Sequence, residues 1–395
     1  MLIPSLRQLP VGINGICLCT CGVAILLRVF IPLYSDSNAN EIIILLLSIS
    51  LALATLYILK CIFFLKEALQ SDWNLPIQIN GIGSLSIALT VQGSLFYDPL
   101  GEPSLSLYWL LLATAFIAYV NIIFLRSCII NNVPPEPIYN TSIFNVFFVP
   151  ALLPSDPSYC VIIRDIFFVY GLIMAAFVVP TSMYRILFLK DEDHATPCVA
   201  RNPTCAIQQA ALSICCTAWL QHPISFSGVD VQQNQGLEVL HLFFALSQVG
   251  YIVTIISIWQ RRSILLATGY HPSWAAFTFP FANTAITTCL YRRTFPKLGV
   301  WLDLLVFYHV IVALLLCGTI TAMYVGKGLF MFPAAIPPES RLKDDSGVVV
   351  FEKADDNDND NGSEVDDDPD VEEAEAVEVD LDVSERTPCV DIGAT

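Results

Sequence analysis

The side chains in this sequence that could act on a small solute are mainly hydroxyls, amides and aromatic rings inside apolar stretches. The clearest group is the run Trp274-Ala-Ala-Phe277-Thr278-Phe279-Pro280. A proline inside a helix breaks the backbone hydrogen-bond ladder and kinks the helix. A ring beside Pro280 can then be displaced toward the space between neighbouring helices. The run predicts either a constriction closed by a phenyl ring or an aromatic side chain buried between helices.

Small or mildly polar residues recur in the same part of several other apolar stretches. The candidates that could line a passage or allow a kink are Asn14, Gly15, Gly22, Asn80, Gly81, Gly83, Thr278 and Pro280. Such residues line wet cavities in membrane proteins, and they also let two helices approach closely without any cavity. Both interpretations are compatible with the sequence alone.

The sequence contains no recognisable enzyme signature. The patterns GxSxG, HExxH, GxxxxGK[ST] and GxGxxG are absent, and the five histidines do not have the spacing of metal ligands. We therefore expect no enzymatic activity, no metal and no cofactor. His241 and His309 are the histidines inside apolar stretches, where an ordinary hydrogen-bonded role is expected.

The composition is that of a membrane protein. Of the 395 residues, 55% are hydrophobic and 14% are charged, whereas about 25% are charged in an ordinary soluble domain. A helix needs about 20 apolar residues to cross a bilayer. Ten apolar stretches are bounded by charge, Pro or Gly: 11–33, 42–65, 76–96, 105–126, 138–154, 161–189, 203–221, 237–260, 272–291 and 300–325.

An internal repeat suggests how these ten stretches are organised. The pattern P-x-x-I-N-G-I occurs at Pro10 and again at Pro76, and Pro137, Pro203 and Pro272 begin the other odd-numbered stretches at similar intervals. Odd stretches are small and mildly polar, whereas even stretches are bulky and apolar. We therefore predict an all-α integral membrane domain of ten transmembrane helices, arranged as five helical hairpins around a central pore, with the odd helices inside.

Charge divides the chain into three parts. Residues 1–338 contain 15 basic and 15 acidic residues, so the net charge of −17 comes from the tail. We predict a short cytoplasmic N-terminus over 1–10, the ten-helix transmembrane domain over 11–328 and a disordered acidic cytoplasmic tail over 339–395. The excess of Lys and Arg on one side places both termini in the cytoplasm, and we expect the plasma membrane and no binding of nucleic acid.

The run W-x-A-F-T-F-P on the ninth of ten helices resembles the tellurite-resistance/dicarboxylate transporter (TDT) family. This family includes bacterial tellurite-resistance proteins, fungal malate permeases and plant slow-type anion channels. The resemblance covers about residues 8–328 and implies five hairpins, a pore lined by odd helices, and a homotrimer in the lipid bilayer. It also implies that a ninth-helix phenylalanine closes the pore, which falls on Phe279, with Phe277 as the second choice.

The resemblance leaves three hypotheses. The first is a passive pathway for small anions, either a C4-dicarboxylate such as malate or inorganic anions, gated at Phe279. The second is a proton-coupled carrier of the same fold, which the absence of carboxylates from the middle of the odd stretches disfavours. The third is a non-transporting receptor or scaffold whose acidic tail recruits partners.

Overall fold

The structure is a computed structural model, and its description covers most of the apolar stretches. The described residues are 9, 12–37, 39–65, 68, 76–97, 100–130, 168–169, 172–173, 176, 179–180, 183–184, 206–221, 234–260, 262 and 272–331. The predicted fifth stretch, 138–154, lies outside them, as do most of the sixth and the whole tail 339–395. All but residue 9 of the predicted N-terminal segment 1–10 also lies outside.

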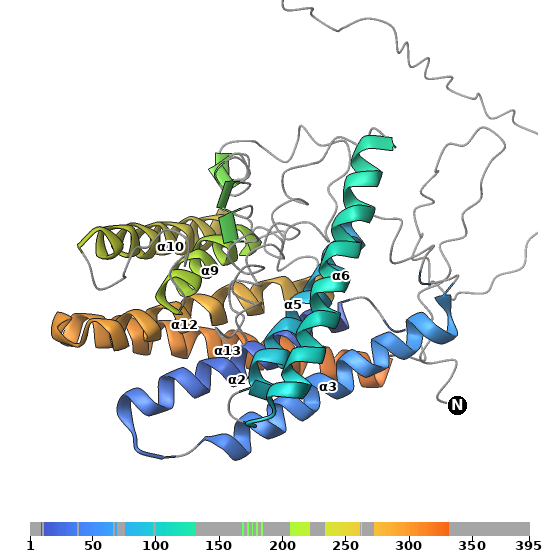
Figure 1. Ribbon diagram of the computed structural model, residues 1–395, viewed down its shortest axis with the longest axis horizontal. Coiled ribbons are helices and arrows are strands. Elements are labelled where there is room, and N and C mark those ends of the chain that lie inside the picture. Colours follow the sequence, from blue (N-terminus) through green and yellow to red (C-terminus); the bar gives the residue numbers. More distant parts are fainter. Residues whose placement is uncertain are drawn as a thin grey trace, which may run out of the picture. The chain divides into compact units, whose positions relative to one another are not determined.

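Every element that is described is a helix (Figure 1). The α-helices are α2 (Ile13–Tyr34), α3 (Asn40–Phe63), α5 (Pro76–Tyr97), α6 (Pro103–Ile130), α9 (Ile207–Gln221), α10 (Asn234–Gln260), α12 (Thr278–Thr294) and α13 (Val300–Met331). Two short 3-10 helices, η5 (Pro272–Phe277) and η6 (Pro296–Leu298), flank α12. Each α-helix coincides with one of the predicted apolar stretches. Four of them, α2, α3, α10 and α13, contain segments long and apolar enough to cross a membrane.

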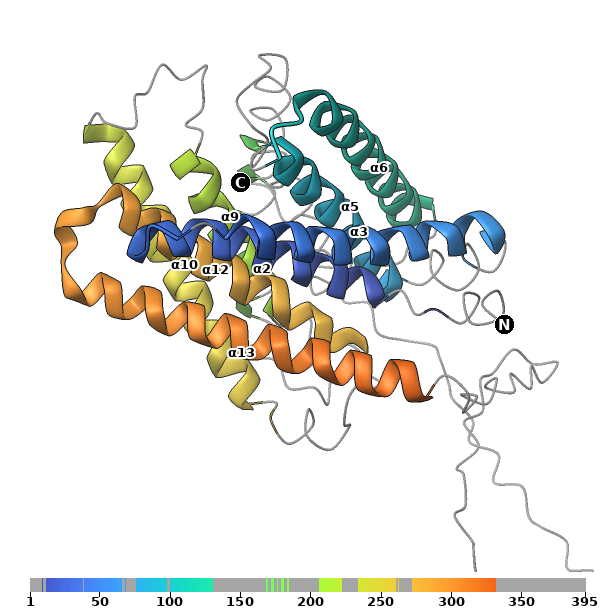
Figure 2. The same cartoon turned by 90° about the horizontal axis from the view of Figure 1, so that it is seen from below.

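Helices that follow one another in the chain pack together. Helix α2 contacts α3, α5 contacts α6, α9 contacts α10, and α12 contacts α13. The odd-stretch helices also contact one another, in the order α5, α2, α12, α9. Figures 1 and 2 show α2 beside α12 in both views. The four described odd-stretch helices therefore form a continuous row, and each even-stretch helix packs on its own partner in that row.

Burial distinguishes the two kinds of helix, as the sequence predicts. In α12 every residue from Thr278 to Cys289 is buried. The even-stretch helices instead expose large apolar side chains, among them Ile44, Leu45 and Ile49 on α3, Tyr108, Leu111 and Leu112 on α6, Ile252, Ile255 and Ile256 on α10, and Leu304, Ile311 and Leu315 on α13. An exposed apolar helix face of this size suits contact with lipid. The odd-stretch helices are thus the inner helices, and the even-stretch helices are the outer ones.

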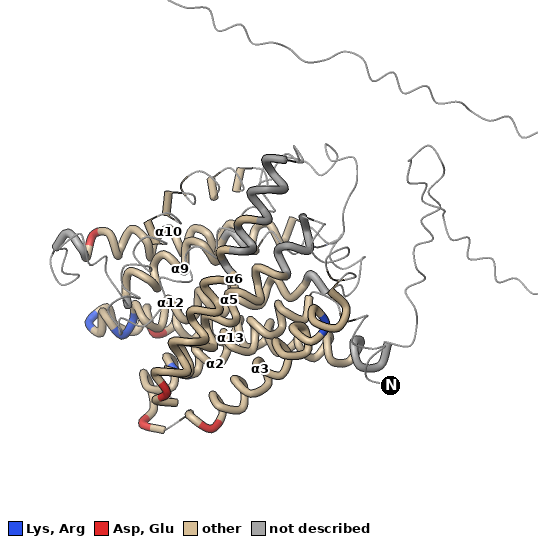
Figure 3. The backbone as a smooth tube through the Cα atoms, turned by 45° about the vertical axis from the view of Figure 1, so that its right-hand side comes forward, with Lys and Arg blue, Asp and Glu red and all other residues tan. Residues whose placement is uncertain are grey.

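Charged residues of the described helices lie mainly near helix ends (Figure 3). At the junction of α12 and α13, the Arg292 guanidinium donates two hydrogen bonds to the Asp303 carboxylate, at 2.7 and 3.1 Å. The hydroxyl of Tyr34 donates to the same carboxylate at 2.6 Å. This cluster joins the C-terminal ends of α2 and α12 to the start of α13. The positive charge of Arg292 is therefore neutralised locally, while Arg293 and Lys297 remain exposed.

Candidate functional site

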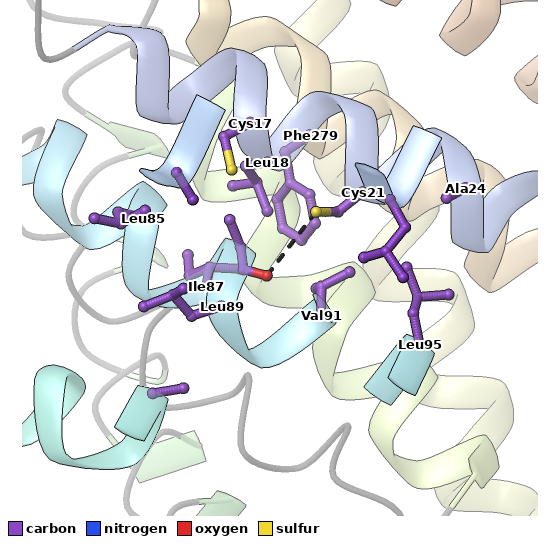
Figure 4. Packing of buried hydrophobic residues seen from close by; sticks show 14 of the residues in the cluster. Cys17, Leu18, Cys21, Ala24, Leu85, Ile87, Leu89, Val91, Leu95 and Phe279 are labelled. Atoms are coloured by element: carbon purple, nitrogen blue, oxygen red, sulfur yellow. Dashed lines mark hydrogen bonds between the residues drawn. The ribbon is translucent and has the colours of Figure 1, made fainter. Parts of the chain in front are cut away.

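The Phe279 side chain lies in the interior of the row of inner helices. Its exposed fraction is 6%, and it belongs to a buried apolar cluster with residues of α2, α5 and α9. Figure 4 shows the ring among the side chains of α2 and α5. The same cluster includes Leu18 and Cys21 of α2, Leu85 and Leu89 of α5, and Ile214 and Cys215 of α9.

Gly22 lies directly against Phe279. A Cβ atom added at Gly22 would lie 3.5 Å from the ring atom Cδ2 of Phe279 and 3.5 Å from Cβ of Ala282. Both distances are ordinary van der Waals contacts, so α2 approaches the Phe279 ring closely at Gly22, and an alanine there would fit without displacing the ring. The sequence singled out both residues, and the structure brings them together.

Phe277 points into a different part of the protein. It is also buried, with an exposed fraction of 4%, but it belongs to a cluster that contains Val306 and Val310 of α13. Its ring makes an edge contact with Trp274, with 6.0 Å between the ring centroids. The two phenylalanines of the F-T-F run are therefore equally buried but have different neighbours, and only Phe279 shares its cluster with α5 and α9.

The chain changes its helical geometry between these two rings. The 3-10 helix η5 ends at Phe277 and α12 begins at Thr278, so Pro280 is the third residue of α12. The missing N–H of a proline leaves no bond unmade in the first turn of an α-helix. The hydroxyl of Thr278 donates to the carbonyl of Ala275 at 2.7 Å, which supports this transition. Thr278 and Pro280 thus lie at an irregular helix start.

The polar side chains of α9 and α12 bond mainly to each other. The amide of Gln209 donates to the Thr284 hydroxyl at 2.6 Å and to the Pro280 carbonyl at 3.3 Å. One turn further along, the amide of Asn283 donates to Ser213 at 2.6 Å, and one turn beyond that the hydroxyls of Thr217 and Thr287 are 2.7 Å apart. These three pairs recur every four residues along α9, so they hold the two inner helices together.

A second polar network connects α2 and α5 to their outer partners. The Ser50 hydroxyl of α3 lies 2.7 Å from Cys21 Sγ and donates to the Cys17 carbonyl at 3.0 Å. The Gln92 amide of α5 donates to Ser50 at 2.8 Å, and its carbonyl oxygen accepts from the Trp109 indole at 3.2 Å. These buried polar groups therefore also act between helices. Phe279 itself belongs to a cluster of apolar side chains.

We expect the α9–α12 pairs to contribute measurably to stability. Thr287→Val keeps the shape of the side chain but removes a hydroxyl that bonds to Thr217 and to the Ser213 carbonyl, at 2.7 and 3.0 Å. It should lower the free energy of unfolding by about 1 kcal/mol, the size of a hydrogen bond between membrane helices. Thermal unfolding in detergent measures the change.

The matched control is Thr254→Val on α10. Thr254 is fully buried, and its hydroxyl has no hydrogen-bond partner in the described part of the chain. The same substitution there removes an unsatisfied polar group and should leave stability unchanged or raised. Equal losses in the two variants would contradict the assignment of the α9–α12 bonds as stabilising.

The remaining predicted residues are distributed along α2 and α5. Gly15 of α2 lies so close to η5 that an added Cβ would be 2.5 Å from Cβ of Ala275. Gly83 is buried in α5, and its carbonyl accepts from the Ser86 hydroxyl at 2.7 Å. Asn14 is fully buried in the first turn of α2. Asn80 and Gly81 belong to α5, but their side-chain surroundings lie outside the described part.

The sequence-based list did not include the apolar residues around Phe279. Leu18 and Cys21, and likewise Leu85 and Leu89, are spaced three or four residues apart and so lie on one face of their helices. That spacing is present in the sequence. This spacing alone did not single out these residues, because leucine is common throughout these stretches. Only the packing identifies which leucines share a cluster with Phe279.

Helices α2, α5, α9 and α12 contain no Asp, Glu or Lys, and no group of three metal-ligating side chains is found in the described ranges. Without a carboxylate these helices cannot supply a proton relay of the usual kind. A ring in an apolar wall can close a passage by excluding water.

Most of the chain matches a known protein family. A family model described as voltage-dependent anion channel matches residues 8–326, which includes every described α-helix except the last turn or so of α13. No curated protein matches the chain. The family match confirms the resemblance to the tellurite-resistance/dicarboxylate transporters, a group of channels and transporters rather than enzymes. The chain therefore belongs to the voltage-dependent anion channel family and is an integral membrane protein.

Proposed function

We propose that this protein passes small anions across the membrane through a pore between its inner helices, and that the Phe279 ring closes the pore. The observation that carries the proposal is the position of Phe279. The ring lies in a cluster to which α2, α5 and α9 all contribute, and it lies close to Gly22 of α2. A hydrophobic constriction of this kind stops ions because the narrow apolar segment does not hold water.

The row of inner helices supports a ring of five hairpins. The row α5, α2, α12, α9 has α5 at one end and α9 at the other. Both end helices contribute residues to the cluster that contains Phe279, Leu85 and Leu89 from α5 and Ile214 and Cys215 from α9, which supports a row that is curved around this residue. The predicted fifth stretch, 138–154, would complete the ring between α9 and α5, and the ten predicted stretches then form five hairpins.

The family and the distribution of charge support proposals for the substrates, the oligomeric state and the orientation in the membrane. We propose C4-dicarboxylates such as malate, or inorganic anions, as the transported species, and a homotrimer in which each subunit has its own pore. We place the protein in the plasma membrane. Because Lys and Arg are more numerous in the loops on the side of the termini, both termini are proposed to face the cytoplasm.

Passive flow is the form of transport that the inner helices favour. No carboxylate lies on the described inner helices, so coupling to protons would have to use the substrate's own proton. A receptor or scaffold role, by contrast, is not favoured by the family match.

The test is anion flux into proteoliposomes that contain the purified full-length protein. The anions are chloride, nitrate, sulfite and malate, with either a membrane potential or a proton gradient as the driving force. A channel is indicated if flux follows the potential, and a carrier if it follows the proton gradient. If neither the wild type nor the Phe279→Ala variant moves any anion, the transport proposal is wrong and the receptor hypothesis takes its place.

A further inference from the structure

Asn14 is a buried amide without a hydrogen-bond partner. Its exposed fraction is 0%, and neither Nδ2 nor Oδ1 makes a hydrogen bond in the structure as described. The amide nitrogens of Gln92, Gln209 and Asn283, on the other described inner helices, all donate at 2.6–2.8 Å. Among the described inner amides, Asn14 thus has both atoms unpaired, whereas Gln209 has only Oε1 unpaired.

Leaving this amide unpaired is unfavourable for the protein alone. A buried polar group without a partner costs about 1–3 kcal/mol, and an apolar residue of the same shape avoids that cost. Leucine would fit the surrounding pattern of α2, which is otherwise rich in Ile, Leu and Cys. A residue that lowers stability in this way is expected where a ligand supplies the missing bonds.

The position of Asn14 favours a negatively charged ligand. It is the second residue of α2, where no side chain caps the helix and no acidic residue lies in the first turn. Side chains in an α-helix lean toward its N-terminus, so the Asn14 amide is aimed at the end where the helix dipole is positive. A helix start without a side-chain cap and a neutral amide together form a site that attracts anions.

Asn14 also lies on the face of α2 that leads to Phe279. Residues 14, 18 and 21 follow one another at four- and three-residue intervals, and Leu18 and Cys21 belong to the cluster of Phe279. Gly22, which contacts the ring, is eight residues beyond Asn14, or about 12 Å along the helix. An anion at Asn14 would therefore lie about two turns from the constriction, on the side of the N-terminus of α2.

We propose that Asn14 and the start of α2 form a binding site for an oxyanion that carries one acidic proton, such as hydrogen malate or bisulfite. Nδ2 donates to the ionised oxygen of the ligand, and Oδ1 accepts the ligand's O–H, so both amide atoms are satisfied. A halide can satisfy only Nδ2. This inference rests on the proposed anion pathway and specifies where along it, and in which protonation state, an anion binds.

The experiment measures ligand-dependent thermal stability of the purified full-length protein in detergent. Malate is added at a pH where it retains one acidic proton and at a pH where both carboxyls are ionised, and chloride is added at the same ionic strength. The wild-type melting temperature should rise with hydrogen malate, and rise less with fully ionised malate or chloride. Asn14→Leu should lose the rise. It should be at least as stable as wild type without ligand.

The control variant is Thr20→Val, which removes a hydroxyl from the same helix. Thr20 bonds to the carbonyl of Ile16 in its own helix, at 2.8 Å, so the variant should respond to malate as the wild type does. The proposal is overturned if wild type shows no rise, if Asn14→Leu keeps the rise, or if Asn14→Leu without ligand is clearly less stable. Since no flux is measured, these outcomes are distinct from a failure of the proposed pore.

Discussion

Anion flux through Phe279→Ala should exceed wild-type flux by about tenfold or more, which corresponds to a barrier lowered by roughly 1.4 kcal/mol or more. The ring is a large, buried side chain of the apolar cluster that joins α2, α5 and α9. Removing it beside Gly22, which has no side chain of its own to close the space, leaves room for water and ions. The measurement is flux per folded protein in proteoliposomes, after size-exclusion chromatography of each variant.

Phe277→Ala is the matched control for this prediction. Phe277 is as buried as Phe279, two residues away, but it packs against Trp274 and against the α13 side of the protein. Both substitutions remove a buried ring and should destabilise by a similar amount, about 3–5 kcal/mol. Only Phe279→Ala should raise flux. An equal rise in both variants would show that loss of packing, and not removal of a gate, causes the leak.

A large loss of stability is expected from a substitution at Gly15, where α2 contacts η5. In Gly15→Ala the new Cβ would lie 2.5 Å from Cβ of Ala275, far inside van der Waals contact. Ala275 has no flexible side chain that could turn away, so the backbones of α2 and η5 must separate. Such overpacking costs about 1–3 kcal/mol, and thermal unfolding in detergent should show a lower melting temperature and a lower yield of folded protein.

Gly318→Ala on α13 provides the comparison. No atom lies within 4 Å of a Cβ added at Gly318, and alanine in a helix interior is more favourable than glycine by roughly 0.5–1 kcal/mol. The same substitution should therefore stabilise at position 318 and destabilise at position 15. If Gly15→Ala is as stable as wild type, the close approach of α2 and η5 is not present in the protein.

Much of the fold could be predicted from the sequence because membrane helices follow hydropathy. The apolar stretches at 11–33, 42–65, 76–96 and 300–325 coincide with helices. The division into inner and outer helices was also predictable, since small and polar residues distinguish one kind from the other. The predicted ring cannot be compared in full, because the stretch 138–154 is not part of the described chain.

The candidate site was predictable only in part. The pattern W-A-A-F-T-F-P identified two rings, and residues two apart point to different sides of a helix, but which ring shares a cluster with α5 and α9 depends on the packing. The sequence also could not separate hydroxyls that face a passage from hydroxyls that join helices. Thr217 and Thr287 turn out to bond to each other across α9 and α12, because their positions on the two helices coincide only after packing.

The most direct test of the pathway past Phe279 is flux through the double variant Phe279→Ala, Gly22→Phe. The Phe279 ring lies close to Gly22 where α2 and α12 pack together, so a phenylalanine at position 22 should refill the space that Phe279→Ala vacates. If the anion path runs between these two residues, flux should rise in Phe279→Ala and return to near the wild-type level in the double variant. A folded double variant that conducts as freely as Phe279→Ala would contradict a pore between α2 and α12 closed at this ring.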